Sequence, residues 1–166
     1  MAASHETLPS ERYSRQTMLP EIGPGGQERL RAARVLIVGL GGLGAPVATY
    51  LAGAGVGHIA LCDPDTVSLS NLQRQTLYAE ADLGKPKTDC TLSRLRAMNS
   101  EIELTAVPEG ITPENARRLV DDCELVVDCT DNFATRYLID DTCAAAGRPW
   151  VYGACLLYTS PSPRDA

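Results

Sequence analysis

The hydrophobic residues of the chain fall into five short runs that have the length of β-strands. These runs occupy residues 35–38, 58–62, 102–107, 124–129 and 150–154. In the first run, four consecutive apolar residues indicate a strand that is buried on both faces, whereas the third run alternates between apolar and polar positions. We therefore predict five strands.

The segments between these runs have the spacing of helices. Helices are predicted over residues 43–55, 86–99, 113–122 and 133–146. In the second of them we expect Leu92, Leu95 and Met98 to point inward, because they recur at helical spacing. Thr112 is a suitable N-cap for the third helix, and Pro113 suits the first helical position after it.

Strands that alternate with helices indicate an α/β protein with a parallel sheet. We predict a Rossmann-like, doubly wound, mainly parallel sheet in the strand order 3-2-1-4-5, with helices on both faces. Two shorter helices, over residues 10–19 and 25–33, would form an N-terminal helical arm. Ligands of such sheets bind where the strand order reverses, which here is between the first and fourth strands.

The length of 166 residues suits one domain, which we place at residues 10–154. We expect residues 1–9 to be disordered. Residues 155–166 abandon the periodicity, are rich in Ser and Pro, and read like the translation of a sequencing-library adapter. We therefore interpret this tail as non-native and the chain as a truncated reading frame.

The charge balance and the apolar runs bear on the partners. The chain has 15 basic and 21 acidic residues and a net charge of −6, which argues against a nucleic-acid or anionic-membrane surface. No apolar run approaches the roughly 20 residues of a membrane span, and the N-terminus lacks the apolar stretch of a signal peptide. We expect a cytoplasmic protein with no nucleic-acid or membrane partner.

The six cysteines form no C-x-x-C pair, and nothing in the sequence has the spacing of metal ligands. Cys62 and Cys129 each fall at the end of an apolar run, where we expect small buried thiols rather than reactive ones. In a reducing compartment, all six cysteines would be free.

A glycine-rich turn follows the first strand directly, with glycines at positions 39, 41, 42 and 44. Glycine lets the backbone approach a ligand closely, and the first turn of the next helix adds unpaired N–H groups, so this turn suits a phosphate. Asp63 ends the second strand, where a carboxylate can accept hydrogen bonds from ribose hydroxyls. The pattern predicts a bound nucleotide, although Asp63 could also be a plain polar strand end.

Two cations and a further carboxylate bear on which nucleotide binds. Arg74 and Lys87 follow Asp63 along a long polar connection, and Asp131 follows the fourth strand. Together they suit a triphosphate with magnesium, the cations on the phosphates and the carboxylate on the metal. Alternatively, the cations are solvated and Asp131 caps the next helix. The glycine turn and Asp63 alone fit a nicotinamide-dependent oxidoreductase equally well.

Five segments together resemble one family of proteins. They are RYSRQ (12–16), VLIVGLGGLG (35–44), AGVGHIALCDPDTVSLSNLQRQTL (54–77), GKPK (84–87) and DCTDNFATR (128–136). In order and spacing they are similar to the MoeB, ThiF and HesA adenylyltransferases, which activate ubiquitin-like sulfur carriers. The resemblance covers residues 10–154. The family normally continues with the carrier-binding surface and often with C-x-x-C zinc ligands, which are absent from this chain, so the resemblance implies an adenylation domain that is incomplete at its C-terminus.

The resemblance implies a site for ATP and Mg²⁺. Its residues would be Gly39, Gly41, Gly42, Asp63, Ser70, Asn71, Arg74, Lys87, Asp131 and Asn132. Implied roles are Lys87 on the α-phosphate, Arg74 and Arg15 on the β- and γ-phosphates, Asn71 in orientation, Asp63 on the ribose and Asp131 on magnesium. Arg15 matches the arginine that reaches into the partner's site in the family's homodimer.

The implied reaction is adenylation of a sulfur carrier that ends in Gly-Gly, such as a ThiS- or MoaD-like protein of thiamine or molybdenum-cofactor biosynthesis. The C-terminal carboxylate attacks the α-phosphorus of Mg-ATP and gives an acyl-adenylate and pyrophosphate. Since such a carboxyl has a pKa of about 3.3–3.7, no general base is needed. A non-catalytic scaffold, a tRNA-modifying dehydratase of the same family and an NAD-dependent oxidoreductase are the alternatives, and the sequence does not identify the carrier.

The role of Asp131 can be tested in a full-length version of the protein. We expect Asp131→Ala to abolish carrier-dependent exchange of pyrophosphate into ATP, because the substitution removes the carboxylate assigned to magnesium. Undiminished exchange in the presence of the carrier would refute that role.

Overall fold

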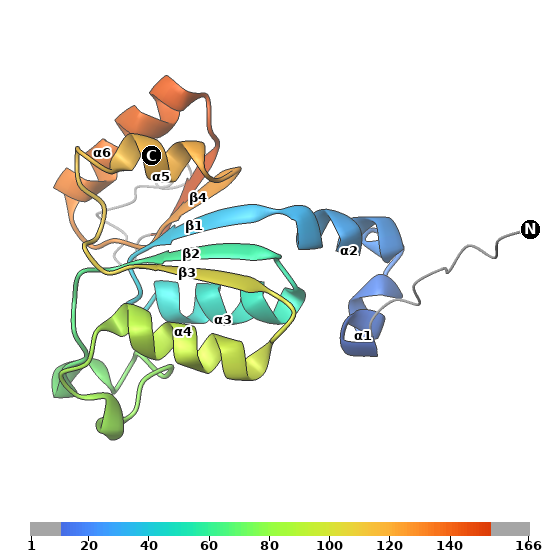
Figure 1. Ribbon diagram of the computed structural model, residues 1–166, viewed down its shortest axis with the longest axis horizontal. Coiled ribbons are helices and arrows are strands. Elements are labelled where there is room, and N and C mark those ends of the chain that lie inside the picture. Colours follow the sequence, from blue (N-terminus) through green and yellow to red (C-terminus); the bar gives the residue numbers. More distant parts are fainter. Residues whose placement is uncertain (1–10, 154–166) are drawn as a thin grey trace, which may run out of the picture.

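The predicted strands form one sheet in the part of the chain that the computed structural model describes, residues 11–153 (Figure 1). They are β1 (Arg34–Val38), β2 (His58–Cys62), β3 (Glu103–Val107), β4 (Leu125–Asp128) and β5 (Trp150–Tyr152). Each neighbouring pair is parallel and the order is β3-β2-β1-β4-β5, which confirms the predicted fold class. The predictions for residues 1–9 and 155–166 lie outside the described residues.

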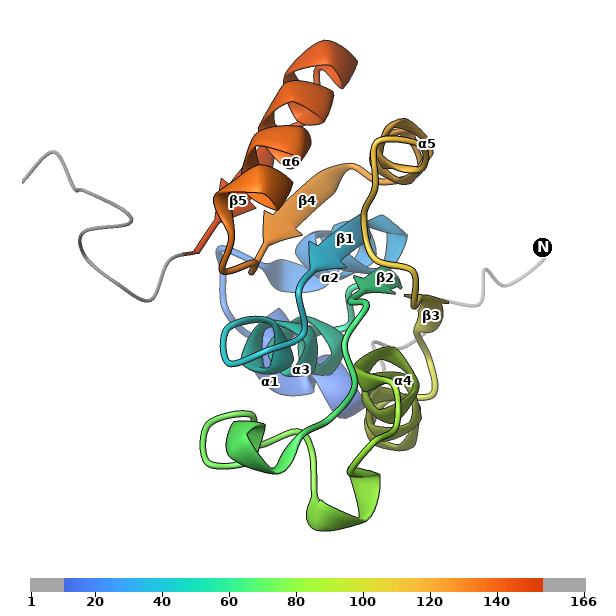
Figure 2. The same cartoon turned by 90° about the vertical axis from the view of Figure 1, so that its left-hand side faces the viewer.

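Helices cover both faces of this sheet. The helical elements are η1 (Glu11–Tyr13), α1 (Ser14–Thr17), α2 (Gly23–Ala32), α3 (Gly44–Ala54), η2 (Leu69–Asn71), η3 (Glu80–Asp82), α4 (Lys87–Met98), α5 (Ala116–Asp121) and α6 (Phe133–Ala146). Seen from the end to which the strands point, α3 and α4 lie on one face of the sheet and α5 and α6 lie on the other (Figure 2). This is the doubly wound arrangement that the sequence predicts.

Two hydrophobic clusters fill the layers between sheet and helices. Successive side chains of a strand point to opposite faces. Val35 and Ile37 of β1 accordingly pack with residues of α3 and α4, whereas Leu36 and Val38 pack with residues of α5 and α6. All four side chains are at most 6% exposed, so β1 is buried on both faces as predicted.

Helix α5 begins later than predicted. Its first residue is Ala116 rather than Pro113, and its N-cap is Asn115 rather than Thr112. The Asn115 side chain accepts a hydrogen bond from the Thr112 amide at 2.8 Å and donates one to the Gly110 carbonyl at 2.9 Å. Because these bonds close a separate turn before the helix, Pro113 lies in that turn.

The inward face of α4 also differs from the prediction at one position. Leu95 is 1% exposed and Leu92 is partly buried, as expected, but Met98 is 37% exposed. The inward position after Leu95 is taken by Asn99, four residues on, which is fully buried. Asn99 donates hydrogen bonds to the Ala52 carbonyl at 2.7 Å and to the Tyr13 hydroxyl at 2.9 Å.

The N-terminal arm differs from the prediction in the bounds of its helices. The helix expected over residues 10–19 consists of η1 and α1, and the following helix begins at Gly23 instead of residue 25. Tyr13 is buried, and Gln16 and Gln27 both donate to the Ala54 carbonyl, at 2.8 and 3.1 Å. These contacts hold the N-terminal arm against the C-terminal end of α3.

The long connection from β2 to α4 is ordered against the glycine-rich turn. It contains η2 and η3, and Val67 and Tyr78 form a small cluster with Cys90 of α4. The Tyr78 hydroxyl donates a hydrogen bond to the carbonyl of Leu40, in the glycine-rich turn, at 2.8 Å. The connection therefore has a fixed position beside the end of β1.

Helix α3 approaches the end of β1 too closely for a side chain at Gly44, where a Cβ atom would lie 1.8 Å from the Gly39 carbonyl oxygen. We expect Gly44→Ala to lower the free energy of unfolding by about 3 kcal/mol, because the backbone must shift. Gly53→Ala in the same helix is the matched control, since a Cβ there meets nothing within 4 Å. It should raise stability by about 0.5–1 kcal/mol. Urea denaturation measures both values, and equal stabilities would contradict the close packing.

Candidate functional site

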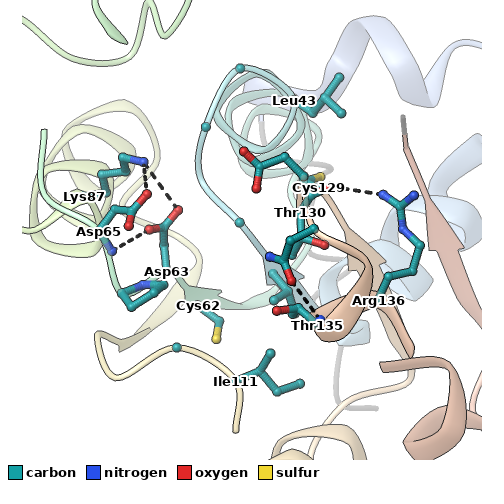
Figure 3. Close-up of a pocket in the computed structure, with 18 of the residues that line it drawn as sticks. Leu43, Cys62, Asp63, Asp65, Lys87, Ile111, Cys129, Thr130, Thr135 and Arg136 are labelled. Carbon is teal, nitrogen blue, oxygen red and sulfur yellow. Dashed lines mark hydrogen bonds and ion pairs between the residues drawn. The ribbon is translucent and has the colours of Figure 1, made fainter. Parts of the chain in front are cut away.

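The carboxyl ends of the strands surround a cavity of about 610 Å³ (Figure 3). Its walls come from the glycine-rich turn, from the segments after β2, β3 and β4, and from the start of α4. Cavities of this size are typical of small-molecule sites. The cavity lies where the strand order reverses, as the topology predicts.

Most of the predicted site residues line this one cavity. They are Gly39, Gly41, Gly42, Asp63, Asn71, Arg74, Lys87, Asp131 and Asn132. Two predicted residues do not line it. Ser70 is exposed, and its hydroxyl lies 3.2 Å from that of Ser68. Arg15 is exposed on α1, at the end of the sheet opposite to the strand ends that form the cavity (Figure 1), so it does not reach the cavity of its own chain.

The glycines of the turn differ in whether the packing of the chain requires them. Gly39 alone among them has a positive φ, +89°, and a Cβ there would lie 2.8 Å from the Cys129 carbonyl oxygen. A Cβ at Gly41 or Gly42 would meet only side chains, at 3.4 and 3.7 Å. The packing of the chain therefore does not require glycine at position 41 or 42. Glycine at these positions leaves the backbone open toward the cavity.

The Asp63 carboxylate joins three segments of the chain at the cavity wall. It accepts hydrogen bonds from the amides of Leu40 at 2.6 Å and Asp65 at 2.8 Å, and it lies 4.0 Å from the Lys87 ammonium. Burial raises the pKa of Asp63, while the two amide hydrogen bonds and Lys87 oppose that rise. The Asp63 side chain thus connects the glycine-rich turn to the end of β2 and to the start of α4.

Lys87 is the first residue of α4 and is only 4% exposed. Its ammonium forms an ion pair with Asp65 at 2.8 Å (Figure 3), and the Asp65 side chain is itself 67% exposed. A buried ammonium needs a counter-ion. Because Asp65 is largely exposed, another anion in the cavity can take over that place.

Arg74 lies beside the glycine-rich turn. A Cβ added at Gly42 would lie 3.7 Å from the aliphatic part of the Arg74 side chain. One guanidinium nitrogen donates to the Ser70 carbonyl at 3.2 Å, which orients the side chain from η2 toward the turn. Asn71, the last residue of η2, lines the cavity next to it.

The turn after β4 bears on the capping interpretation of Asp131. The N-cap of α6 is Asn132, whose side chain accepts a hydrogen bond from the Thr135 amide at 2.9 Å (Figure 3). Asp131 is exposed and lines the cavity. Its carboxylate is therefore available to a ligand, and the capping role belongs to its neighbour.

Sequence reasoning missed several polar residues of the cavity wall, among them Asp65, Gln75, Glu109 and Arg136. All of these except Glu109 lie inside the segments that carried the family resemblance, which is the signal that could have found them. Gln75 is 3% exposed, and its side-chain oxygen has no hydrogen-bond partner among the described residues. Such an orphaned acceptor suits a donor from a bound ligand or water.

The charges around the cavity nearly balance. Its carboxylates are Asp63, Asp65, Glu109 and Asp131, and its basic side chains are Arg74, Lys87 and Arg136. A bare triphosphate would meet little net positive charge here, whereas its magnesium complex is less negative. Within residues 11–153, no group of three or more His, Cys, Asp or Glu side chains could hold a metal alone. A metal ion beside Asp131 would therefore need further ligands, such as the oxygens of a bound phosphate.

Two of the wall residues are cysteines with suppressed acidity. Cys62 is buried, as predicted, but Cys129 is only half-buried. Burial, together with a smaller effect of the nearby carboxylates of Asp63 and Asp128 respectively, raises the pKa of Cys62 to about 12 and that of Cys129 to about 11. The five cysteines in the described part of the chain are free thiols; Cys155 lies outside it.

A parallel sheet in this order, with a glycine-rich turn after β1 and a buried acid after β2, defines a Rossmann-like nucleotide-binding domain. The chain belongs to the ThiF family, whose family model matches residues 13–161. This confirms the family that the sequence motifs indicate.

Relatives of known name agree with this assignment. The chain is 48% identical over 144 residues to the sulfur carrier protein adenylyltransferase of Thermus thermophilus, which covers 87% of this chain and 53% of the relative. It is 50% identical over 147 residues to the adenylyltransferase and sulfurtransferase MOCS3 of Mus musculus, which covers 89% of this chain and 32% of the relative. The chain thus spans about half or a third of the length of these relatives.

A solved structure with a bound nucleotide has the same fold. It is E. coli tRNA N6-threonylcarbamoyladenosine dehydratase, TcdA, in complex with ATP, with a TM-score of 0.80 and 27% identity. The match covers 85% of this chain and 58% of that chain.

In the part of the chain that the structure describes, no helix has the length and apolar character to cross a membrane.

The raised pKa values of the two thiols predict that they are unreactive. With a pKa of about 11, roughly one Cys129 side chain in a thousand is a thiolate at pH 8. We expect neither Cys62 nor Cys129 to be alkylated by iodoacetamide at pH 8 in the time that free cysteine needs, and both to react in guanidinium. Peptide mass spectrometry measures the alkylation, and rapid labelling of Cys129 in the folded protein would contradict the expectation.

Proposed function

We propose that the intact protein is an ATP-dependent adenylyltransferase that activates the C-terminal glycine of a ubiquitin-like sulfur carrier. One observation carries the proposal: two cations and two carboxylates from four segments line one cavity beside a glycine-rich turn. They are Arg74, Lys87, Asp63 and Asp131. The names of relatives that are about half identical to this chain support the same activity.

The nucleotide would lie across the ends of β1 and β2. The open backbone of Gly41 and Gly42 receives the phosphates. Asp63 already accepts two amide hydrogen bonds, and the remaining lone pairs of its carboxylate can accept ribose hydroxyls. Lys87 exchanges Asp65 for the α-phosphate, a move that keeps its buried ammonium paired.

The other phosphates and the metal would occupy the side of the cavity toward β4. Arg74 binds the β- and γ-phosphates from the turn that follows η2, and Asn71 of η2 orients them. Asp131 holds magnesium together with phosphate oxygens. When bound, magnesium offsets the charge that develops on the phosphates during the transfer.

The chemistry needs no proton acceptor in this chain. The attacking group is the ionised C-terminal carboxylate of the carrier, whose oxygen bonds to the α-phosphorus as the bond to pyrophosphate breaks. Within the described residues, His58 lies at the start of β2, the end away from the cavity. Catalysis would therefore rest on position and charge, from Lys87, Arg74 and Asn71.

A second copy of the chain would complete the site. Arg15 is exposed and cannot reach its own cavity, which is compatible with a homodimer in which it enters the partner's site. We place the protein in the cytoplasm, with a carrier that ends in Gly-Gly as its partner. Its pathway would be thiamine or molybdenum-cofactor biosynthesis.

The alternatives are weaker on specific grounds. A nicotinamide-dependent oxidoreductase binds no triphosphate. The two cations Lys87 and Arg74 would then have no triphosphate to bind. A non-catalytic scaffold has no need for the buried Lys87. The dehydratase TcdA shares the fold but is only 27% identical to this chain. The sulfur carrier protein adenylyltransferase of Thermus thermophilus is 48% identical to it.

Binding of Mg-ATP to the chain tests the site directly. We expect Lys87→Met to weaken Mg-ATP binding at least about 100-fold, because it removes a buried charge-assisted contact. Lys85→Met, two residues earlier and 59% exposed, is the matched control and should bind normally. Isothermal titration with Mg-ATP and with NAD measures the affinities. Preferential binding of NAD, or equal affinities of the two variants, would refute the proposed site.

A further inference from the structure

Arg136, a residue of the cavity wall, forms an ion pair with the fully buried Asp128, and the proposed reaction does not use this pair. We propose that Arg136 is a positioning residue that sets the location of the Asp131 carboxylate by holding the turn after β4. The inference rests on the proposed function, because it assigns to Arg136 the support of the magnesium ligand named there. Neither residue of the pair was singled out from the sequence.

The Arg136 guanidinium connects three segments of the chain. It donates to the Asp128 carboxylate at 3.1 Å, to the Thr130 carbonyl at 3.0 Å and to the Gly153 carbonyl at 3.1 Å. These acceptors belong to the end of β4, the turn before α6 and the residue after β5. A planar guanidinium can serve three acceptors at fixed angles, which an ammonium cannot do with the same geometry.

Asp128 completes the support from the other side of the turn. It is fully buried, and its second carboxylate oxygen accepts hydrogen bonds from the Thr130 amide at 2.8 Å and from the Thr130 hydroxyl at 2.6 Å. Thr130 is thus held at its amide and hydroxyl by Asp128. Its carbonyl accepts a hydrogen bond from Arg136 (Figure 3). Asp131 is the next residue, so its backbone is fixed by these bonds.

Two aromatic rings keep the guanidinium in place. Its carbon lies 5.0 Å from the centre of the Tyr152 ring and 5.9 Å from that of the Phe133 ring. The Arg136 side chain is 12% exposed. Cation–π contacts and burial both reduce its freedom to leave Asp128.

The arrangement is more than a cap for α6. Asn132 caps that helix through the Thr135 amide, and this bond involves neither Arg136 nor Asp128. Arg136 instead fixes the peptide that precedes Asp131, whose own side chain is exposed at the cavity. Residues that orient a metal ligand typically change metal affinity about 10- to 100-fold when they are replaced.

The experiment measures how ATP binding by the full 166-residue chain depends on magnesium. We expect Arg136→Lys, which keeps the charge but loses the fork, to raise the magnesium concentration for half-maximal ATP binding about 10-fold or more. ATP binding in EDTA should not change. In the Asp131→Asn background, Arg136→Lys should have no further effect, because the ligand it positions is gone.

Two controls separate positioning from loss of stability. Ile139→Val destabilises the same helix from its fully buried face, and Arg117→Lys alters an exposed ion pair of α5. Both should keep the magnesium dependence of the unaltered chain. If Arg136→Lys shifts that dependence no more than Ile139→Val does, or shifts it equally with Asp131→Asn present, the inference is wrong.

Amide hydrogen exchange at Thr130 tests the support without any nucleotide. In Arg136→Lys this amide should exchange at least about 10-fold faster than in the unaltered chain, because its turn is held less firmly. Faster exchange in a chain that binds no ATP would leave the support standing and refute the proposed function. Unchanged exchange would overturn the inference, whatever the chain binds.

Discussion

The buried carboxylate of Asp63 is the contact on which the rest of the site depends. Through two amides and an ammonium it joins the glycine-rich turn, the segment after β2 and the start of α4. A buried charge is stable only when its hydrogen bonds and counter-ions are complete. The requirement to satisfy Asp63 therefore fixes the relative positions of Leu40, Asp65 and Lys87, which form the wall for the ribose and phosphates in the proposed site.

The same construction recurs on the other side of β1. Asp128 ends β4 as Asp63 follows β2, and each accepts the amide two residues further on, at 2.8 Å in both cases. Each also lies beside a cation from the following helix, Lys87 or Arg136. Two buried acids thus flank the glycine-rich turn. One supports the cation that faces the cavity, and the other supports the turn that carries Asp131.

The site is nearly neutral as a whole, and this constrains what it can bind. Lys87 is already paired with Asp65, and Arg136 with Asp128. Arg74 is the remaining basic side chain of the cavity wall. An anionic ligand has to bring its own positive charge or displace a carboxylate from one of these cations. This favours a metal–triphosphate complex over a bare polyanion. Membership of the ThiF family and the names of relatives are in agreement with such a ligand.

The sequence alone determined the strands, their order and nine residues of the cavity wall. Apolar runs and glycine turns are local signals, and alternation of strands and helices leaves few topologies. Only the tertiary structure decided the pairings that join distant segments. Lys87 with Asp65 and Asn99 with Tyr13 depend on how the helices pack, and the start of α5 depends on a side chain that closes its own turn. Hydrogen bonding among buried polar groups is a property of the folded arrangement, which no local pattern encodes.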